Sequence, residues 1–349
     1  MKQIVAISMG DPGGIGPEII LKAVSSGHLD QGVRPLVIGD AHLLAELAEA
    51  HLAPFFIHSI RSMADISCSP NALNVWDVST PNSIYTIGKP SAVNGDEAFR
   101  CIQRAIILAM NRSVVAVTTG PISKEALHMA GHLYPGHTEI FAKLTNTHDY
   151  AMLLVSKHLK VIHATTHIAL SKVGASLTIQ RIIKVIELAQ EAGVWFGLPK
   201  PRIAVAGLNP HCSENGLFGN EEVEIIIPAI TQMREQGLLV EGPIPPDTVF
   251  VKALCGQYDF VVAMYHDQGH IPLKIDSFSM NPNNGGIRTI GGVNITVGLP
   301  IIRTSVDHGT AYDLAGLWNA SAESMEDAIN LAAVMAKHGG LDNSIKKAK

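Results

Sequence analysis

Short apolar runs rich in β-branched residues alternate along the chain with longer segments in which apolar residues recur at helical spacing. Strands are predicted over residues 4–8, 33–38, 113–118, 161–164, 202–206 and 260–264. Helices are predicted over residues 18–26, 41–51, 97–111, 176–192 and 220–236. This alternation predicts an α/β protein whose sheet is mostly parallel.

One segment breaks this pattern. Residues 276–292 are rich in Asn, Ser, Pro and Gly, a composition that predicts a long surface loop. The chain has 349 residues, about twice the size of a typical domain, so we expect two domains.

Composition then narrows the classes of function. The net charge is −5 and no basic stripe occurs, which argues against a nucleic-acid partner. No apolar run approaches the roughly 20 residues that a membrane helix needs. The four cysteines are scattered without a CxxC pair, which argues against a disulfide framework or a zinc–thiolate site. We therefore expect a cytoplasmic protein with no membrane partner.

Three of the predicted strands are each followed by a histidine. His167 follows the strand at 161–164, His211 the strand at 202–206, and His266 the strand at 260–264. Ligands of open α/β sheets collect at the carboxyl ends of strands, and neutral imidazole is a common ligand for divalent metals. Three histidines with an open coordination position are typical of a catalytic metal site.

Two carboxylates accompany these histidines. Asp247 and Asp267 are candidates for additional metal ligands or for hydrogen-bonding partners of the ligands. Their spacing fits an ordinary turn or helix-start aspartate equally well, and each histidine taken alone fits a surface or core residue. The sequence leaves both interpretations open.

A glycine-rich turn, residues 10–16, follows the first predicted strand. It does not match the G-x-G-x-x-G pattern of dinucleotide-binding loops. Pro17 in the first turn of the following helix favours a tight structural turn over a cofactor cradle.

A candidate anion site begins at residues 135–139, Pro-Gly-His-Thr-Glu, before a helical run. Backbone amides at a helix start, together with His137 and Thr138, suit a phosphate group. Lys274 and Arg303 are cations in apolar surroundings and are the usual partners of phosphate. A plain helix cap and snorkelling surface cations are the alternatives.

At this point the motifs resemble those of a known family, the 4-hydroxythreonine-4-phosphate dehydrogenases of vitamin B6 biosynthesis, over nearly the whole chain. The motifs that carry the resemblance are residues 10–18, Thr119-Gly120-Pro121-Ile122-Ser123-Lys124, 134–139, Asn209-Pro210-His211, 216–222, Pro246-Asp247-Thr248, 265–270, 292–296 and 303–310.

The resemblance implies a two-domain fold of the isocitrate/isopropylmalate dehydrogenase type, without a Rossmann motif. The cofactor-side domain would comprise residues 1–127 and 305–349. Residues 128–304 would form the domain for metal, substrate and dimerisation. Two chains would form a homodimer.

The resemblance also implies the catalytic centre. His167, His211 and His266 would bind one divalent metal ion (Zn²⁺, Mg²⁺ or Co²⁺), with His266 coming from the partner subunit. Asp247 and Lys274 would complete the set of catalytic residues.

The substrate and cofactor positions follow in the same way. His137, Thr138, Lys274, Asn294 and Arg303 would bind the substrate, chiefly around its phosphate. The stretch 308–316 would lie against the adenosine of NAD or NADP. Its candidate contact residues are His308, Gly309, Thr310 and Asp313.

The implied reaction is oxidation and decarboxylation of 4-hydroxy-L-threonine 4-phosphate to 3-amino-2-oxopropyl phosphate. Two features depart from the biosynthetic pattern: seventeen residues separate Lys274 from Gly292, and Leu317-Trp318 follows Gly316. They favour, as an alternative, a catabolic branch that converts 4-phospho-D-threonate to dihydroxyacetone phosphate. A tri-histidine metallohydrolase and a non-catalytic phosphate-ligand binder are more distant alternatives.

Overall fold

The computed structural model describes residues 2–280, 287–289 and 292–339. The chain divides into two compact units, one formed by Met1–Thr147 and Leu299–Lys349 and the other by His148–Gly298. The resemblance implied domain boundaries between residues 127 and 128 and between residues 304 and 305. The observed units differ, and His137, Thr138 and Arg303 belong to the first unit. The strand that begins at Arg303 pairs with a strand of that unit.

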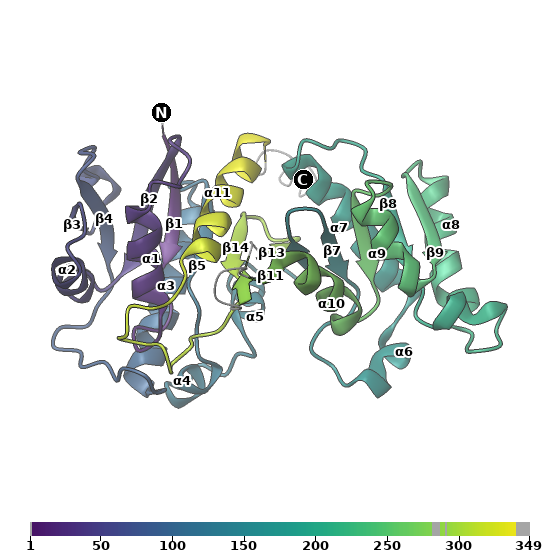
Figure 1. Ribbon diagram of the computed structural model, residues 1–349, viewed down its shortest axis with the longest axis horizontal. Coiled ribbons are helices and arrows are strands. Elements are labelled where there is room, and N and C mark those ends of the chain that lie inside the picture. Colours follow the sequence, from purple (N-terminus) through teal and green to yellow (C-terminus); the bar gives the residue numbers. More distant parts are fainter. Residues whose placement is uncertain (1, 281–286, 290–291, 340–349) are drawn as a thin grey trace. The chain divides into compact units, whose positions relative to one another are not determined.

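Six strands of the first unit follow one another in the order β3-β4-β2-β1-β5-β14, and every pair between them is parallel. The strands are β1 Gln3–Ser8, β2 Val33–Gly39, β3 Phe56–Ile60, β4 Ala72–Asp77, β5 Ala116–Thr119 and β14 Arg303–Val306. The helices are α1 Gly16–Ser25, α2 Ala41–Ala50, α3 Ala92–Met110, α4 Lys124–Met129, α5 His137–Leu144 and α11 Glu323–Lys337, with a short 3₁₀ turn at Met63–Asp65. Figure 1 shows these strands among α1, α3 and α11.

Side-chain caps explain where several of these helices begin. Asp40 accepts hydrogen bonds from the amides of His42 and Leu43 at the start of α2. Ser91 accepts one from Asn94 at the start of α3, so this helix begins five residues before the predicted position 97. Such caps satisfy amides that the first helical turn leaves without partners.

The second unit contains strands in the order β13-β6-β7-β10-β8-β9. Both pairs that include β6 are antiparallel, and the pairs from β7 to β9 are parallel. The strands are β6 Ala151–Val155, β7 Lys160–His163, β8 Ile203–Ala206, β9 Val240–Ile244, β10 Phe260–Ala263 and β13 Val293–Val297. The helices are α6 Val173–Ser176, α7 Ile179–Trp195, α8 Ile227–Glu235, α9 Pro246–Leu254 and α10 His266–Ser277. Two 3₁₀ segments, Leu170–Lys172 and Pro210–Glu214, and a π-helical turn, Glu222–Ile226, complete it.

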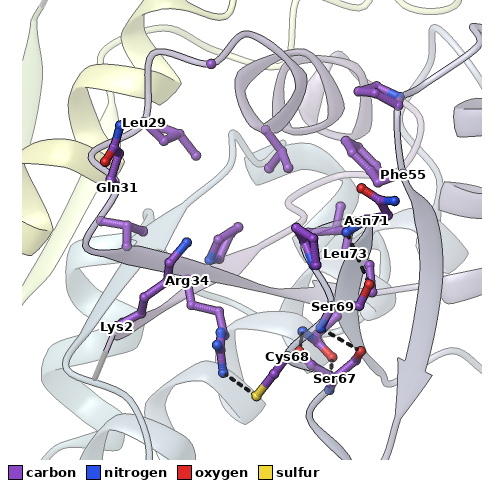
Figure 2. Close-up of a pocket in the computed structure, with 18 of the residues that line it drawn as sticks. Lys2, Leu29, Gln31, Arg34, Phe55, Ser67, Cys68, Ser69, Asn71 and Leu73 are labelled. Carbon is purple, nitrogen blue, oxygen red and sulfur yellow. Dashed lines mark hydrogen bonds between the residues drawn. The ribbon is translucent and has the colours of Figure 1, made fainter.

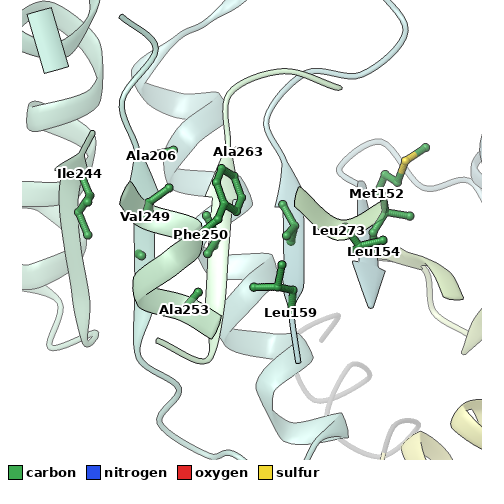
Figure 3. Close-up of a cluster of buried hydrophobic side chains, with 13 residues drawn as sticks. Met152, Leu154, Leu159, Ala206, Ile244, Val249, Phe250, Ala253, Ala263 and Leu273 are labelled. Atoms are coloured by element: carbon green, nitrogen blue, oxygen red, sulfur yellow. The ribbon is translucent and has the colours of Figure 1, made fainter. Parts of the chain in front are cut away.

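Alternate residues along the strands of the second unit point into its core. Val161, Ala204 and Val261 lie in one buried cluster with Phe250 of α9 and Leu273 of α10, as Figure 3 shows in part. Alternate residues of neighbouring strands share one face of a sheet. This packing fixes α9 and α10 on the strands that carry the candidate histidines.

The α/β class and the mostly parallel strands are confirmed, and so are the predicted strands, with bounds that shift by up to three residues. The predicted loop at 276–292 is wrong in part, because α10 continues to Ser277 and two short strands, β11 Phe278–Met280 and β12 Ile287–Thr289, pair antiparallel. The rest of that segment up to residue 291 lies outside the described residues. In the part of the chain that the structure describes, no helix has the length and apolarity needed to cross a membrane.

A carboxylate lies in the core of the first unit. Glu97 of α3 is fully buried, and Nη2 of Arg100 donates a hydrogen bond to it at 2.5 Å. Burial raises the pKa of Glu97 to about 7; the charge of Arg100 opposes the rise, and Asp40, Asp77 and Asp96 add to it. The folded protein therefore binds a proton here at a pH where the unfolded chain has lost it.

We expect Glu97→Gln to weaken the pH dependence of stability. A carboxyl group whose pKa is raised on folding stabilises the fold below its unfolded pKa, and this contribution is lost as the pH rises toward about 7. The stability of the wild type should fall more steeply between pH 5 and pH 7, an interval on the order of the shift, than that of the variant. Denaturant midpoints across this range measure the effect. Glu49→Gln, at an exposed position of α2, is the control; equal slopes for all three proteins would contradict the expectation.

Candidate active site

The glycine-rich turn between β1 and α1 uses its amides inside the protein. The amide of Asp11 donates to the carbonyl of Pro121 at 2.9 Å, and that of Ile15 donates to the carbonyl of Thr310 at 3.0 Å. The amide of Gly13 donates to Oδ1 of Asp11 at 2.8 Å. A phosphate cradle needs amides that point at the ligand. These contacts support the interpretation of residues 10–16 as a structural turn.

The glycine-rich turn, residues 10–16, also contacts the predicted cofactor stretch, residues 308–316. Tyr312 donates a hydrogen bond to Oδ2 of the fully buried Asp11 at 2.7 Å. A Cβ atom added at Gly14 would lie 2.8 Å from the carbonyl oxygen of Thr310, so a side chain there would displace the stretch. Burial raises the pKa of Asp11, and the hydrogen bonds from Tyr312 and Gly13 oppose that rise. His308, Gly309 and Asp313 are exposed on this support.

Arg303 is a buried cation of the first unit. Its side chain is only 2 % exposed, so the alternative of a snorkelling surface cation is wrong. Nη2 donates to Oγ1 of Thr119 at 2.8 Å, and the guanidinium lies 5.6 Å from the ring of Phe141. β14 supplies Arg303, β5 supplies Thr119 and α5 supplies Phe141. A buried guanidinium is a strong donor set for a planar or tetrahedral anion.

His137 lies beside this cation at the start of α5. Burial, and then the charge of Arg303, lower the pKa of His137 well below its usual value, so its imidazole is neutral. Nε2 of His137 is buried and makes no hydrogen bond within the described ranges. Burial lowers the pKa of Arg303 to about 9, and the charge of Glu139 opposes this change. A buried polar atom without a partner is energetically costly, so a ligand that forms a hydrogen bond with Nε2 of His137 would be favoured here.

The other predicted substrate residues lie in the second unit. Asn294 belongs to β13, where its Oδ1 is buried and has no hydrogen-bond partner among the described residues. Lys274 lies in the last turn of α10 and is half-buried. Thr138 follows His137 in α5 of the first unit. The grouping of these five residues around one ligand stays a prediction.

In the second unit, hydrogen bonds hold the strand ends that carry the histidines. The amide and Oγ1 of Thr165 both donate to the carbonyl of Met264, at 3.2 and 2.7 Å. This brings the loop after β7 to the end of β10. The ring centroids of His167 and His266 consequently lie 5.5 Å apart, with 45° between the ring planes.

This spacing fits two imidazoles that share an ion. With Zn–N bonds of about 2.0–2.1 Å, the centroids of two imidazoles on a tetrahedral ion lie about 5 Å apart. Asp267 adds a second feature of metal sites, because its Oδ1 lies 2.7 Å from Nδ1 of His266. A carboxylate only accepts, so Nδ1 carries the proton and Nε2 has the free lone pair. Of the two roles that the sequence left open for Asp267, the structure favours the orienting partner.

His211 lies in an unusual turn after β8. Residues 211–215 all have positive φ, between 43° and 63°. Left-handed backbone costs L-residues about 1–2 kcal/mol each, and such strain is typical of functional sites. Glu222 holds the turn in place, because it accepts hydrogen bonds from the amides of Leu208 and Asn209 at 2.8 and 2.7 Å and one from Nδ2 of Asn209.

Gln268 connects the loops after β8 and β10, and the sequence analysis missed its role. The amide of Met264 donates to its Oε1 at 2.6 Å, and its Nε2 donates to the carbonyl of Gly207 at 2.8 Å. The residue is 7 % exposed. Its position two residues after His266, within the motif at 265–270, was the only signal in the sequence.

His167 and His266 of one chain therefore lie together, whereas the resemblance implied that His266 would join the site from the partner subunit. His211 does not complete the group within one chain. Over residues 2–280, 287–289 and 292–339, the structure contains no cluster of three or more His, Cys, Asp or Glu side chains suited to a metal ion. Asp247 is exposed in the first turn of α9. A single chain thus presents an incomplete ligand set.

A separate pocket of about 490 Å³ lies in the first unit, and Figure 2 shows its lining. Nη1 of Arg34 donates to Sγ of Cys68 at 3.2 Å within it. Lys2, Arg34 and Ala72 line it from the amino-terminal ends of β1, β2 and β4. Ligands of parallel sheets bind at the carboxyl ends of the strands, so this pocket lies at the wrong edge for the candidate site.

Comparison with known proteins identifies relatives over almost the full length. Residues 31–332 match the family of the pyridoxal phosphate biosynthetic protein PdxA. The chain is 48 % identical over 339 residues to the D-threonate 4-phosphate dehydrogenase of Pectobacterium atrosepticum, covering 96 % of this chain and 100 % of the relative. It is 44 % identical over 340 residues to the 4-hydroxythreonine-4-phosphate dehydrogenase of Trichlorobacter lovleyi, covering 96 % and 98 %.

A solved structure gives the same result. The structure of a 4-hydroxythreonine-4-phosphate dehydrogenase from Klebsiella pneumoniae is 49 % identical and superimposes with a TM-score of 0.84. The alignment covers 96 % of this chain and 98 % of that protein.

We expect Tyr312→Phe to loosen the stretch 308–316 without unfolding the protein. The variant loses a hydrogen bond to a buried carboxyl group, a contribution of roughly 1.5–3 kcal/mol, so amides of this stretch should exchange with solvent about tenfold or more faster. Hydrogen exchange followed by mass spectrometry measures this directly. Tyr258→Phe removes the chemically similar bond to Glu241 at 2.6 Å in the second unit and is the control. Unchanged exchange of residues 308–316 in the first variant would show that the bond does not hold the stretch.

Proposed function

Because the chain belongs to the PdxA family, we propose that it oxidises and decarboxylates a small, 4-phosphorylated hydroxy acid of the threonine type. Its relatives are dehydrogenases, so the chain is an oxidoreductase that acts on a CH–OH group. The observation that best supports the substrate class is the buried Arg303 beside the neutral imidazole of His137. The guanidinium that Thr119 orients can donate charge-assisted hydrogen bonds to a phosphate group.

The preferred substrate in this proposal is 4-phospho-D-threonate. The D-threonate 4-phosphate dehydrogenases of Pectobacterium atrosepticum and Salmonella typhimurium are 48 % and 50 % identical to this chain. The 4-hydroxythreonine-4-phosphate dehydrogenases of Trichlorobacter lovleyi and Desulfosudis oleivorans are 44 % and 45 % identical. The second candidate substrate is 4-hydroxy-L-threonine 4-phosphate, because related structures that carry this name are 48–49 % identical.

The phosphate contacts provide binding energy away from the reacting carbon. Arg303 and His137 would anchor the phosphate, with Thr138 at the start of α5 and with Lys274 and Asn294 from the second unit. Contacts to a remote group position the reacting carbon and thereby lower the entropic barrier. A nicotinamide cofactor, once bound, would supply a hydride acceptor for C3 as the C3 hydroxyl loses its proton.

The histidines would hold a divalent ion, Zn²⁺, Mg²⁺ or Co²⁺. Once bound by His167, His211 and His266, the ion would supply Lewis-acid chemistry at the substrate oxygens. Asp267 keeps Nε2 of His266 unprotonated for this role. Asp247 is proposed to accept the proton of the C3 hydroxyl. When CO₂ leaves, the bonding electrons move toward the C3 ketone, and Lys274 is proposed to protonate C2.

The cofactor is proposed to lie on the stretch 308–316, with His308, Gly309, Thr310 and Asp313 as contacts. The support is the exposure of His308, Gly309 and Asp313, together with the hydrogen bond from Tyr312 of this stretch to the buried Asp11. A nicotinamide cofactor follows from the dehydrogenase family; NAD and NADP both remain within the proposal.

A homodimer with a shared active site is part of the proposal. The exposed side chains Val251 and Leu254 of α9 and Ile271 and Ile275 of α10 line one shallow pocket of about 480 Å³. Contiguous exposed apolar surface is typical of protein interfaces. Asp247 and Asp267 also line this pocket, so it adjoins the catalytic candidates. A ligand set that one chain leaves incomplete is what a site completed by a second copy would show.

We expect Arg303→Met to raise KM for the phosphorylated substrate by roughly 10- to 100-fold, because it removes a charge-assisted contact of about 1.5–3 kcal/mol. Met keeps much of the buried volume. The unphosphorylated analogue, D-threonate, should show little change. Steady-state kinetics with both compounds measure the split, with Arg202→Met, at a partly exposed ion pair with Asp259, as the control. An equal effect on both compounds would argue against a phosphate role.

The direct test of the function is NAD(P)H formation by the purified protein with a divalent metal and each substrate in parallel. We expect turnover of 4-phospho-D-threonate with release of CO₂ and dihydroxyacetone phosphate. Turnover of 4-hydroxy-L-threonine 4-phosphate alone would establish the second candidate instead. Absence of turnover with both substrates, with both cofactors and metal present, would refute the proposed reaction.

A further inference from the structure

Four imidazoles form a continuous row in the second unit. The ring centroids of His167 and His266 are 5.5 Å apart, those of His266 and His270 are 3.6 Å apart, and those of His270 and His163 are 5.0 Å apart. The row begins at the proposed metal site and ends in the core, where His163 is fully buried. The proposed function gives roles only to the first two of these residues.

Hydrogen bonds fix the tautomers along the row. Nδ1 of His270 lies 2.9 Å from the carbonyl oxygen of His266, one helical turn earlier in α10. Nδ1 of His163 lies 3.3 Å from the carbonyl oxygen of Met152 in β6. Carbonyl oxygens only accept, so Nδ1 is the protonated nitrogen in both rings. Each ring is therefore held through Nδ1, as His266 is held by Asp267.

The stack itself excludes His270 as a further ligand of the same ion in this arrangement. The rings of His266 and His270 are 11° from parallel and overlap at 3.6 Å. An imidazole lone pair lies in the plane of its ring, and metal–nitrogen bonds are about 2.0–2.1 Å long. One ion cannot lie in two nearly parallel planes that are this far apart. His270 contacts His266 through its face, which restricts rotation of the His266 ring.

His163 contacts both His270 of the stack and Gly269 of α10. A Cβ atom at position 269 would lie 2.3 Å from Nε2 of His163, so only glycine allows α10 to approach the buried ring this closely. His163 is fully buried, so it gives the stack a fixed anchor in the core.

We propose that His270 is a positioning residue, which holds His266 by face-to-face stacking in the orientation of a metal ligand, with His163 as its anchor in the core. This inference rests on the proposed metal site. It assigns His270 a role that neither strand-end spacing nor the family motif provides. Partners that orient a ligand typically change metal affinity by 10- to 100-fold when they are lost.

Titration of the metal-free protein with Co²⁺, followed by its visible absorption bands, tests the proposal without turnover. His270→Leu removes both the stack and the hydrogen bond, and we expect Co²⁺ affinity to fall by roughly 10- to 100-fold. His270→Phe keeps a flat ring in place and should bind within about threefold of the wild type, because stacking is retained. His132→Leu is the control; this histidine stacks on Phe99 at 3.9 Å in the first unit, and its loss should leave Co²⁺ binding unchanged.

The outcomes separate this proposal from the function on which it rests. If the wild type binds no Co²⁺, the metal site fails and the positioning role falls with it. If the wild type binds Co²⁺ and His270→Leu binds equally well, the positioning role alone is refuted. If His270→Leu does not fold, His270→Phe decides: wild-type affinity supports stacking, and a loss beyond tenfold contradicts it.

Discussion

Parallel strands that end at a common edge are the constraint on which the candidate site depends. β7, β8 and β10 are neighbours, so the loops after them must begin close together. Thr165 and Gln268 then fix the arrangement of these loops, because they donate hydrogen bonds to the carbonyls of Met264 and Gly207 across the strand ends. Hydrogen bonds from side chains to backbone carbonyls therefore hold the loops that carry the histidines.

In each of the two units, polar residues show that the structure tolerates unfavourable local energies where ligands are expected. Arg303 and Asp11 are buried, and residues 211–215 adopt left-handed backbone. Each is held by specific partners: Thr119 for the guanidinium, Tyr312 for the carboxyl group, and Glu222 for the strained turn. Buried charge and strain persist in proteins when the surrounding structure overdetermines them, and they concentrate at functional sites.

The sequence predicted strands built on apolar runs rich in β-branched residues, such as β1 and β10, but missed the equally apolar β6. It did not predict β14, whose residues Arg303-Thr304-Ser305 are polar, because their burial depends on partners such as Thr118 and Ala328 that are distant in the sequence. The strand-end histidines could be predicted for the same reason as the strands. The supporting contacts could not: Tyr312 and Asp11 are 301 residues apart, and the approach of α10 to His163 depends on the absence of a side chain at Gly269.

The central claim is that strand-end histidines form a metal centre, and anomalous diffraction from crystals grown with Zn²⁺ tests it most directly. The account predicts one strong peak about 2.0–2.1 Å from imidazole nitrogens of His167, His211 and His266, with one of these residues supplied by a second copy of the chain. A peak bonded to other residues, or no peak near these imidazoles in a correctly folded crystal, would contradict it.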